Sequence, residues 1–224
     1  MPDASPDAPL GLFGGTFDPL HFGHLRLAED AADALQLARV RWLPAGQPAL
    51  REAPLASAAQ RLAMVSLAVA GNPRFEVDAA ESESARPSYT VATLERLRQP
   101  GMCGARRPLV LLLGADAFGG LPGWHRWESL FDLAHIAVAH RPGFAVDPAS
   151  LPDALARHYR QRFSADPAAI ARAPGGCITE FAMTQLDISA TKIRSLLSKG
   201  RSARYLIPDA LLAYIHDHRL YPET

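Results

Sequence analysis

The sequence predicts an α/β domain with a doubly wound, mostly parallel sheet, helices on both faces, and a small helical part at the C-terminus. Two observations support this prediction. Strand and helix patterns alternate from residue 10 onward, and residues 109–113 are apolar at every position. A wholly apolar strand is typical of the centre of a parallel sheet that helices cover on both faces. We expect a single domain over residues 1–224, with a sheet-containing core at 9–186 and a helical segment at 187–224.

Each element follows from local patterning. Short apolar or β-branched runs predict strands at 10–13, 40–43, 75–77, 109–113, 136–138 and 178–181. Helical periodicity predicts helices from residue 25, from an N-cap at Ser57, from an N-cap at Ser88 or Thr90, across 151–163, from Ser189, and across 208–218. We interpret Gly14-Gly15 as the turn after the first strand.

Composition narrows the class of protein and its partners. Lys+Arg and Asp+Glu both number 23, so the chain has no general attraction for nucleic acid or for an anionic membrane, and we expect neither as a partner. The N-terminal residues lack the basic and apolar regions of a signal peptide, and the longest apolar run is too short to span a bilayer. Isolated Cys103 and Cys177 suit a reducing compartment and lack nearby zinc ligands. We therefore expect a cytoplasmic location.

The segment GGTFDPLHFGH, residues 14–24, has the layout of a phosphate-binding loop. Glycine lets the backbone approach a ligand closely, and the following helix supplies free N–H groups and a partial positive charge. His21 and His24 are spaced so that both imidazoles face one side of the helix start. Asp18 is of a type that bonds nearby backbone N–H groups, and Pro19 stiffens the turn. Two alternatives remain: a zinc pair, or two histidines that only cap a turn.

A second motif, ISATKIR, occupies residues 188–194. Ser189 is a natural N-cap, and Thr191 with the first-turn amides is placed to meet phosphate. The Arg194 fork suits two phosphate oxygens at once. The alternative is an ordinary capped helix with a solvated Lys192 and Arg194.

These two segments carry a family resemblance. The first resembles the GTFDPxHxGH signature of the adenylyltransferase superfamily with a (T/H)xGH motif. The second is similar to the ISSTxIR motif that accompanies it, with Ala190 in place of the second serine. The resemblance implies a Rossmann-like fold in which His21 and His24 contact the phosphates of ATP.

The middle of the chain resembles bacterial nicotinate-nucleotide adenylyltransferase. The segments that carry this similarity are PSYTVATL, GAD with the tryptophans after it, HRPG, and the C-terminal LY. The similarity covers roughly residues 10–221. It implies adenylyl transfer from ATP to nicotinate mononucleotide, giving nicotinate adenine dinucleotide and pyrophosphate in NAD biosynthesis. It also implies Mg²⁺ as a companion of ATP with few direct protein ligands.

The resemblance assigns roles to individual residues. The catalytic set is His21, His24 and Arg194. The ATP-binding set is Gly14, Gly15, Thr16, His24, Gly114, Asp116, Ile188, Ser189, Thr191 and Arg194. The set that binds nicotinate mononucleotide is Thr16, Arg51, Tyr89, Thr90, Trp124, His125 and Arg141, with Trp124 stacked on the pyridine ring and amides near Thr90 and His125 on the carboxylate.

Some of these assignments have ordinary structural alternatives. Trp124 is also a reasonable core residue, Asp116 a helix N-cap, and Arg141 a solvated surface residue. Two loops depart from the family pattern. Leu50 replaces a histidine beside Arg51, and residues 81–84 lack an arginine that relatives carry.

Three other functions remain as alternatives. The first is an adenylyltransferase for nicotinamide mononucleotide or pantetheine phosphate, and the second is a nucleotide sensor that does not catalyse a reaction. The third is a dehydrogenase, which the absence of a GxGxxG fingerprint argues against.

Overall fold

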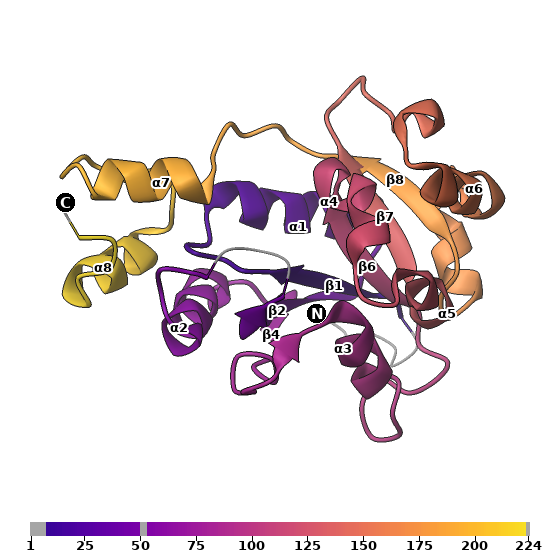
Figure 1. Ribbon diagram of the computed structural model, residues 1–224, viewed down its shortest axis with the longest axis horizontal. Helices are drawn as coiled ribbons and strands as arrows, with labels where there is room; N and C mark the ends of the chain where they lie inside the picture. The colour runs from indigo at the N-terminus through magenta and orange to yellow at the C-terminus, as the bar shows by residue number, and fades with distance from the viewer. Residues whose placement is uncertain (1–7, 50–52, 223–224) are drawn as a thin grey trace. The chain divides into compact units, whose positions relative to one another are not determined.

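A six-stranded sheet organises the chain in the computed structural model, which describes residues 8–49 and 53–222 (Figure 1). The strand order is β4-β2-β1-β6-β7-β8, and the pairs β1/β6, β6/β7 and β7/β8 are parallel. The first strand lies inside the sheet and later strands extend outward on both sides of it, which is the doubly wound order. The predicted fold class is therefore confirmed. The strands are β1 (Leu10–Gly15), β2 (Arg39–Pro44), β4 (Phe75–Val77), β6 (Leu109–Gly114), β7 (His135–His140) and β8 (Ile178–Ala182).

The remaining elements are helices and a short separate strand pair. The helices are α1 (Phe22–Ala34), α2 (Ala58–Val69), α3 (Thr90–Leu97), α4 (Ala115–Gly119), α5 (Leu130–Leu133), α6 (Asp153–Arg162), α7 (Ala190–Leu197) and α8 (Asp209–Asp217). Strands β3 (Gln47–Pro48) and β5 (Pro87–Ser88) pair in parallel. Within the described residues, no helix has the length and apolar character that crossing a bilayer requires.

The chain divides into two compact units, and each consists of several segments. Of the described residues, the first unit holds 8–13, 27–41 and 89–184. The second unit holds 14–26, 42–49, 53–88 and 185–222. The single-domain organisation with a boundary at residue 187 stays a prediction.

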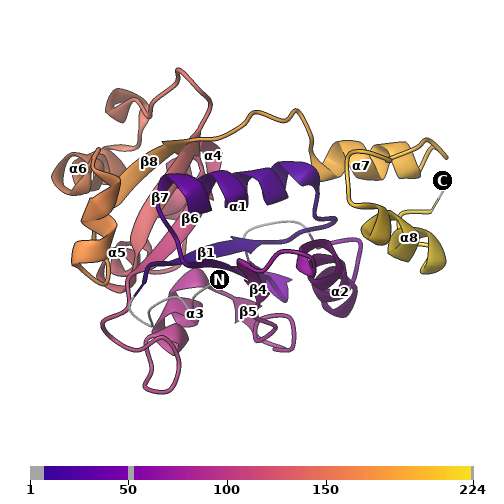
Figure 2. The same cartoon turned by 180° about the vertical axis from the view of Figure 1, so that it is seen from behind.

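The core of the first unit is built around β6. Residues 109–113 are at most 5% exposed, because β1 and β7 pair with β6 on its two edges. Helices α1 and α3 lie on opposite sides of β1 in both views (Figure 1, Figure 2). The wholly apolar run therefore has the central position that the sequence predicts.

A single arginine secures the end of α3 in the first unit. Arg98 is the C-cap of that helix, and its guanidinium donates to the carbonyl oxygens of Leu133 (Nε, 2.8 Å), Arg107 (2.7 Å) and Pro174 (2.7 Å). Burial lowers the pKa of Arg98. One fork of donors thus satisfies carbonyl groups from three separate loops.

In the second unit, α2 begins with a complete capping box. The Ser57 hydroxyl accepts from the amide of Gln60, and the Gln60 side chain accepts from the amide of Ser57 (2.9 Å). The predicted cap at Ser57 is therefore confirmed. The buried face of α2 is formed by Met64, Val65 and Val69 together with Arg61.

Three local predictions are corrected. Gly14 and Gly15 are the last residues of β1 rather than a turn after it. Helix α3 has Tyr89 as its N-cap, without a side-chain cap, instead of Ser88 or Thr90. Helices α4 and α5 were not predicted, because five and four residues are too few to show a 3.6-residue period.

Replacing Ser57 with alanine is expected to destabilise the protein by about 1 kcal/mol, because the amide of Gln60 loses its acceptor. Urea denaturation measures the change. Ser66→Ala is the matched control, since Ser66 is exposed on the same helix, and we expect it to be neutral or slightly stabilising. Equal effects of the two variants would contradict the capping argument.

Candidate functional site

The segment between β1 and α1 has an unusual backbone that places its side chains closely together. Phe17 has a φ of +51°, in the left-handed region, and its buried ring meets the His24 ring edge-on at 5.2 Å. A Cβ on Gly15 would lie 2.8 Å from the Phe17 ring. Glycine at position 15 is therefore required by this close approach, which fixes the path of the loop.

His21 and His24 form a stacked pair at the start of α1. Their ring centroids are 3.7 Å apart with an angle of 24° between the planes. The amide of His21 donates to Nδ1 of His24 (3.3 Å), so the proton of a neutral His24 ring lies on Nε2. The predicted shared orientation of the two imidazoles is thus present.

The His21 ring is buried and incompletely bonded. It is 7% exposed, and burial lowers its pKa to about 4. Its Nδ1 has no hydrogen-bond partner among the described residues. A buried polar atom of this kind is costly unless a ligand or water satisfies it, so His21 is a strong candidate for a ligand contact.

The second motif meets the first within the same unit. Ser189 is the N-cap of α7, and its hydroxyl accepts from the amide of Lys192 (3.2 Å). The Arg194 guanidinium donates to the backbone oxygen of Asp18 (2.7 Å) and to the Thr191 hydroxyl (3.4 Å). A Cβ on Gly23 would lie 3.8 Å from the backbone oxygen of Ile188. The structure thus brings together two segments that are far apart in the sequence.

Asp18 has more distant partners than the sequence indicates. Its carboxylate accepts from the amides of Leu55 (2.9 Å) and Ala56 (3.1 Å) and from the Tyr221 hydroxyl (2.6 Å). We predicted that Asp18 bonds backbone amides of its own loop. This prediction is wrong, because its carboxylate accepts from amides of the chain before α2. Asp18 links the loop after β1 to α2 and to the C-terminus.

Arg61 was missed by sequence reasoning. It is 1% exposed, and its guanidinium donates to the carbonyl oxygens of Thr16 (2.8 Å), Ala45, Gly46 (2.7 Å) and Ala56 (3.2 Å). Burial lowers the pKa of this group, and the nearby Asp18 charge opposes that shift. The sequence did hold a sign of its burial. Arg61 precedes Met64 by three residues and Val65 by four, which places it on the apolar face of the helix.

The first unit holds another group of predicted residues. The rings of Tyr89 and His125 are 4.7 Å apart. Thr90 is the first residue of α3, which begins without a side-chain cap, so its first amides are available to an anion. Trp124 is half-buried at the end of a short 3-10 helix, and Arg126 beside it pairs with Glu95 of α3 (2.8 Å).

Asp116 and Arg141 follow the ends of β6 and β7, two neighbouring strands of the same unit, and both side chains are exposed. Gly114 is the N-cap of α4, and Asp116 lies in the first turn of that helix, so Asp116 itself is not the cap. Arg141 follows β7, and its backbone oxygen is 2.9 Å from Nδ1 of His140. Arg51 lies outside the described residues.

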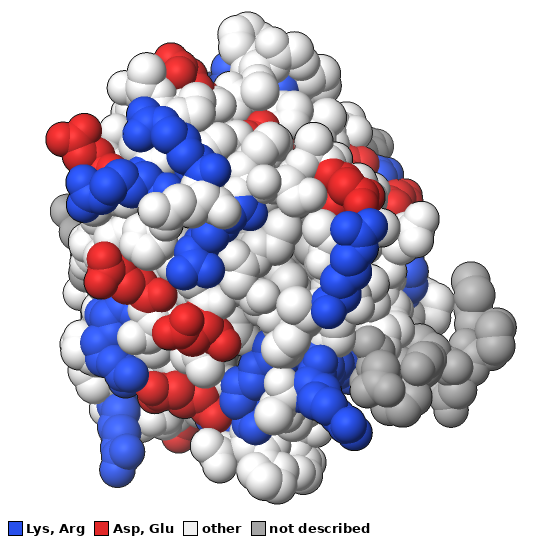
Figure 3. Space-filling view, turned by 90° about the vertical axis from the view of Figure 1, so that its right-hand side faces the viewer, with Lys and Arg blue, Asp and Glu red and all other residues white. Residues whose placement is uncertain are grey.

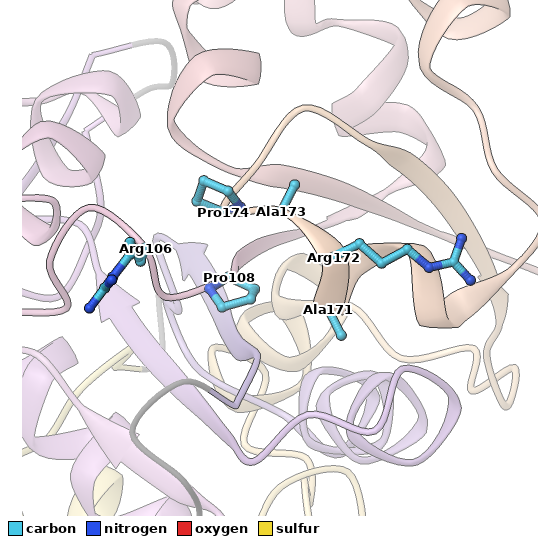
Figure 4. Close-up of a pocket in the computed structure, with 6 residues that line it drawn as sticks. All are labelled: Arg106, Pro108, Ala171, Arg172, Ala173 and Pro174. Atoms are coloured by element: carbon cyan, nitrogen blue, oxygen red, sulfur yellow. The ribbon is translucent and has the colours of Figure 1, made fainter.

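A pocket in the first unit contains none of these residues. Its lining consists of Arg106, Pro108, Ala171, Arg172, Ala173 and Pro174 (Figure 4). The guanidinium groups of Arg106 and Arg172 point away from each other, and Arg172 pairs with Asp166 (2.8 Å). The basic side chains of this pocket therefore do not converge on one point. On the face of the molecule that Figure 3 shows, acidic and basic side chains are interspersed. Among the described residues, no group of three or more His, Cys, Asp or Glu is placed to hold a metal ion.

The family model and the relatives of known name agree with one another. The family model described as cytidylyltransferase-like matches residues 12–196. A protein of Dechloromonas aromatica named "Probable nicotinate-nucleotide adenylyltransferase" is 58% identical over 213 residues, which cover 95% of this chain and 97% of that protein. A protein of the same name from Pseudomonas aeruginosa (strain UCBPP-PA14) is 50% identical over 212 residues, covering 95% and 96%.

Solved structures with the same fold are more distant in sequence. The nicotinic acid mononucleotide adenylyltransferase of Plasmodium falciparum, complexed with APC, has a TM-score of 0.67 and 15% identity, covering 96% of this chain and 97% of that one. The structure of that protein complexed with NaAD has a TM-score of 0.64, 14% identity and the same coverage. At these identities the likeness shows the fold alone.

The low pKa of His21 makes stability depend on pH. Because the folded pKa of about 4 lies below the ordinary 6.5, the unfolded chain binds the proton first as the pH falls. The stabilisation is therefore complete above pH 6.5 and is lost as the pH falls toward 4. Urea denaturation at pH 7 and pH 4.5 should show a smaller loss in His21→Asn than in the unchanged protein. An equal loss in both proteins would contradict the burial of a neutral His21.

Proposed function

Because this chain belongs to the nicotinate-nucleotide adenylyltransferases of the cytidylyltransferase-like family, we propose that it transfers the adenylyl group of ATP to nicotinate mononucleotide. The products are nicotinate adenine dinucleotide and pyrophosphate. The observation that carries the ATP half of this proposal is the cluster of His21, His24 and Arg194 in one unit. The Arg194 guanidinium donates to the backbone oxygen of Asp18 and to the Thr191 hydroxyl, so these two contacts leave its charge in place.

The proposed chemistry is a direct in-line displacement. A phosphate oxygen of nicotinate mononucleotide attacks the α-phosphorus of ATP, a new P–O bond forms, and the bond to the β-phosphate oxygen breaks. No side chain serves as a nucleophile, so catalysis consists of positioning and charge stabilisation. His21, which burial keeps neutral, and His24 donate hydrogen bonds to the phosphates, His21 near the α-phosphate. Arg194 and the first amides of α7 hold the β- and γ-phosphates.

Magnesium enters this proposal as part of the substrate. Mg²⁺ prefers phosphate oxygens and retained waters to a full set of protein ligands. We therefore take MgATP to be the species bound, with its charge partly neutralised by the ion. The reaction needs only small-molecule partners, and we place it in the cytoplasm, where ATP is abundant.

The proposal that nicotinate mononucleotide is the acceptor depends mainly on residues of the first unit. The uncapped start of α3 at Thr90 offers amides to the nicotinate carboxylate, which the neutral amide of nicotinamide mononucleotide would use poorly. Tyr89 and His125 adjoin this helix end, and Trp124 supplies a flat surface for the pyridine ring. Arg141 of this unit is assigned to phosphate, as is Arg51 of the second unit, whereas Asp116 is assigned to ribose hydroxyls as part of the ATP-binding set.

The central test is His21→Ala. Loss of one preorganised donor to a developing charge lowers kcat by about 10²–10³, and release of pyrophosphate from MgATP and nicotinate mononucleotide measures it. His216→Ala on α8 is the matched control, since that histidine is exposed and belongs to no proposed site. Turnover of His21→Ala within threefold of the unchanged protein would remove His21 from the catalytic set.

A panel of acceptors tests the specificity. We expect the highest kcat/KM with nicotinate mononucleotide, compared with nicotinamide mononucleotide and pantetheine phosphate. ATP binding without turnover of any acceptor would instead identify a nucleotide sensor. In the same assay, Trp124→Ala should raise KM for nicotinate mononucleotide about tenfold through lost stacking and burial. Trp127→Phe is the control, because Trp127 packs against Phe131 and His158.

A further inference from the structure

The buried carboxylate of Asp18 is held entirely by neutral donors. It is 6% exposed as a residue and receives the amides of Leu55 and Ala56 and the hydroxyl of Tyr221. These three donors, two amides and one hydroxyl, hold both oxygens of the carboxylate in place. Burial lowers the pKa of Arg61, and attraction to the charge of Asp18 opposes that shift. Arg61 therefore offsets part of the charge of Asp18.

Arg194 also contacts Asp18, but this contact does not neutralise the charge of the arginine. Its guanidinium donates to the backbone oxygen of Asp18, not to the carboxylate, and its second contact is the Thr191 hydroxyl. Because both of these acceptors are neutral, Arg194 keeps its positive charge beside the loop after β1. That charge is what a triphosphate requires.

Tyr221 is the component of this arrangement that lies farthest away in the sequence. It is 6% exposed, has a φ of +54°, and its hydroxyl lies 2.6 Å from Oδ1 of Asp18. Burial and the hydrogen bond to Asp18 raise the pKa of Tyr221, so it remains a neutral donor through the physiological range. The charges of Arg194 and Arg61 also act on this hydroxyl, which shows that all four groups share one electrostatic environment.

We propose that Tyr221 is a positioning residue that holds the Asp18 carboxylate away from Arg194 and so keeps the arginine charge available to the phosphates of ATP. Without the hydroxyl, Asp18 loses one of its three donors, and its carboxylate turns toward the guanidinium of Arg194, which already donates to the backbone oxygen of the same residue. The resulting ion pair competes with the triphosphate. The inference rests on the proposed function in taking ATP as the ligand of this unit.

Tyr221→Phe tests this role with Tyr214→Phe as the matched control. Tyr214 is on α8, and its ring stacks on His218 at 3.9 Å, so the control removes a hydroxyl close by in the sequence without touching Asp18. Calorimetry with Mg²⁺ and α,β-methylene-ATP should show about tenfold weaker binding for Tyr221→Phe, the effect of one lost bond to a charged group. Tyr214→Phe should bind as the unchanged protein does.

Kinetics and a double variant separate positioning from a merely structural role. Tyr221→Phe should raise KM for ATP and leave KM for nicotinate mononucleotide unchanged. In an Asp18→Asn background the same change should weaken binding by less than about twofold, because a neutral amide forms no ion pair with Arg194. A lower melting temperature with unaltered affinity for the ATP analogue would overturn the inference.

The outcome also distinguishes this inference from the proposed function. If the unchanged protein turns over nicotinate mononucleotide but Tyr221→Phe binds the analogue normally, the inference fails and the function stands. If no acceptor is turned over, the proposed function fails, while weaker binding of the analogue by Tyr221→Phe still supports the role of Tyr221.

Discussion

The loop after β1 depends on the buried guanidinium of Arg61. A loop that presents amides and imidazoles to an anion must direct its carbonyl groups elsewhere, and buried carbonyls need donors. Arg61 supplies them to Thr16, Ala45, Gly46 and Ala56 at once. A planar fork of five donors does this with one side chain, which lysine cannot do. The ends of β1 and β2 and the chain before α2 are therefore joined at one point.

The histidine pair beside this loop shows a compromise between stability and ligand binding. Burial keeps His21 neutral, and stacking at 3.7 Å would make two protonated rings repel each other. A neutral ring still donates one hydrogen bond, and its unpartnered Nδ1 leaves a polar group to be satisfied. Nδ1 of His21, which has no partner among the described residues, thus lies where the proposed reaction develops negative charge.

Much of the fold was predictable because its signals are local. The apolar run at 109–113 and the cap at Ser57 each specify an element without reference to the rest of the chain. The start of α3 was misjudged because Ser88 and Thr90 are both good caps by composition. The backbone places Tyr89 there instead, and its side chain makes no cap.

The site was predictable in part. Two motifs identified His21 and Arg194, and the structure brings their segments together. Arg61 lies in no motif, and the C-terminal LY that includes Tyr221 does not indicate the contacts of that tyrosine. Their importance depends on contacts with Thr16 and Asp18 across distances in sequence that no local pattern encodes. Supporting residues of this kind emerge only when the partners of each buried carbonyl and carboxylate are identified.

The distribution of charge around Asp18 suits a reaction that must release its product. A site with several uncompensated cations would bind pyrophosphate as tightly as it binds ATP, and uniform binding of substrate and product does not accelerate turnover. Here Asp18 offsets part of the charge of Arg61, and Arg194 adds a permanent positive charge that bonds a backbone oxygen and a hydroxyl. The imidazoles of His21 and His24 add donors without adding fixed charge. Because their strength as donors rises with the negative charge opposite them, they would favour the transition state of the proposed reaction over either ground state.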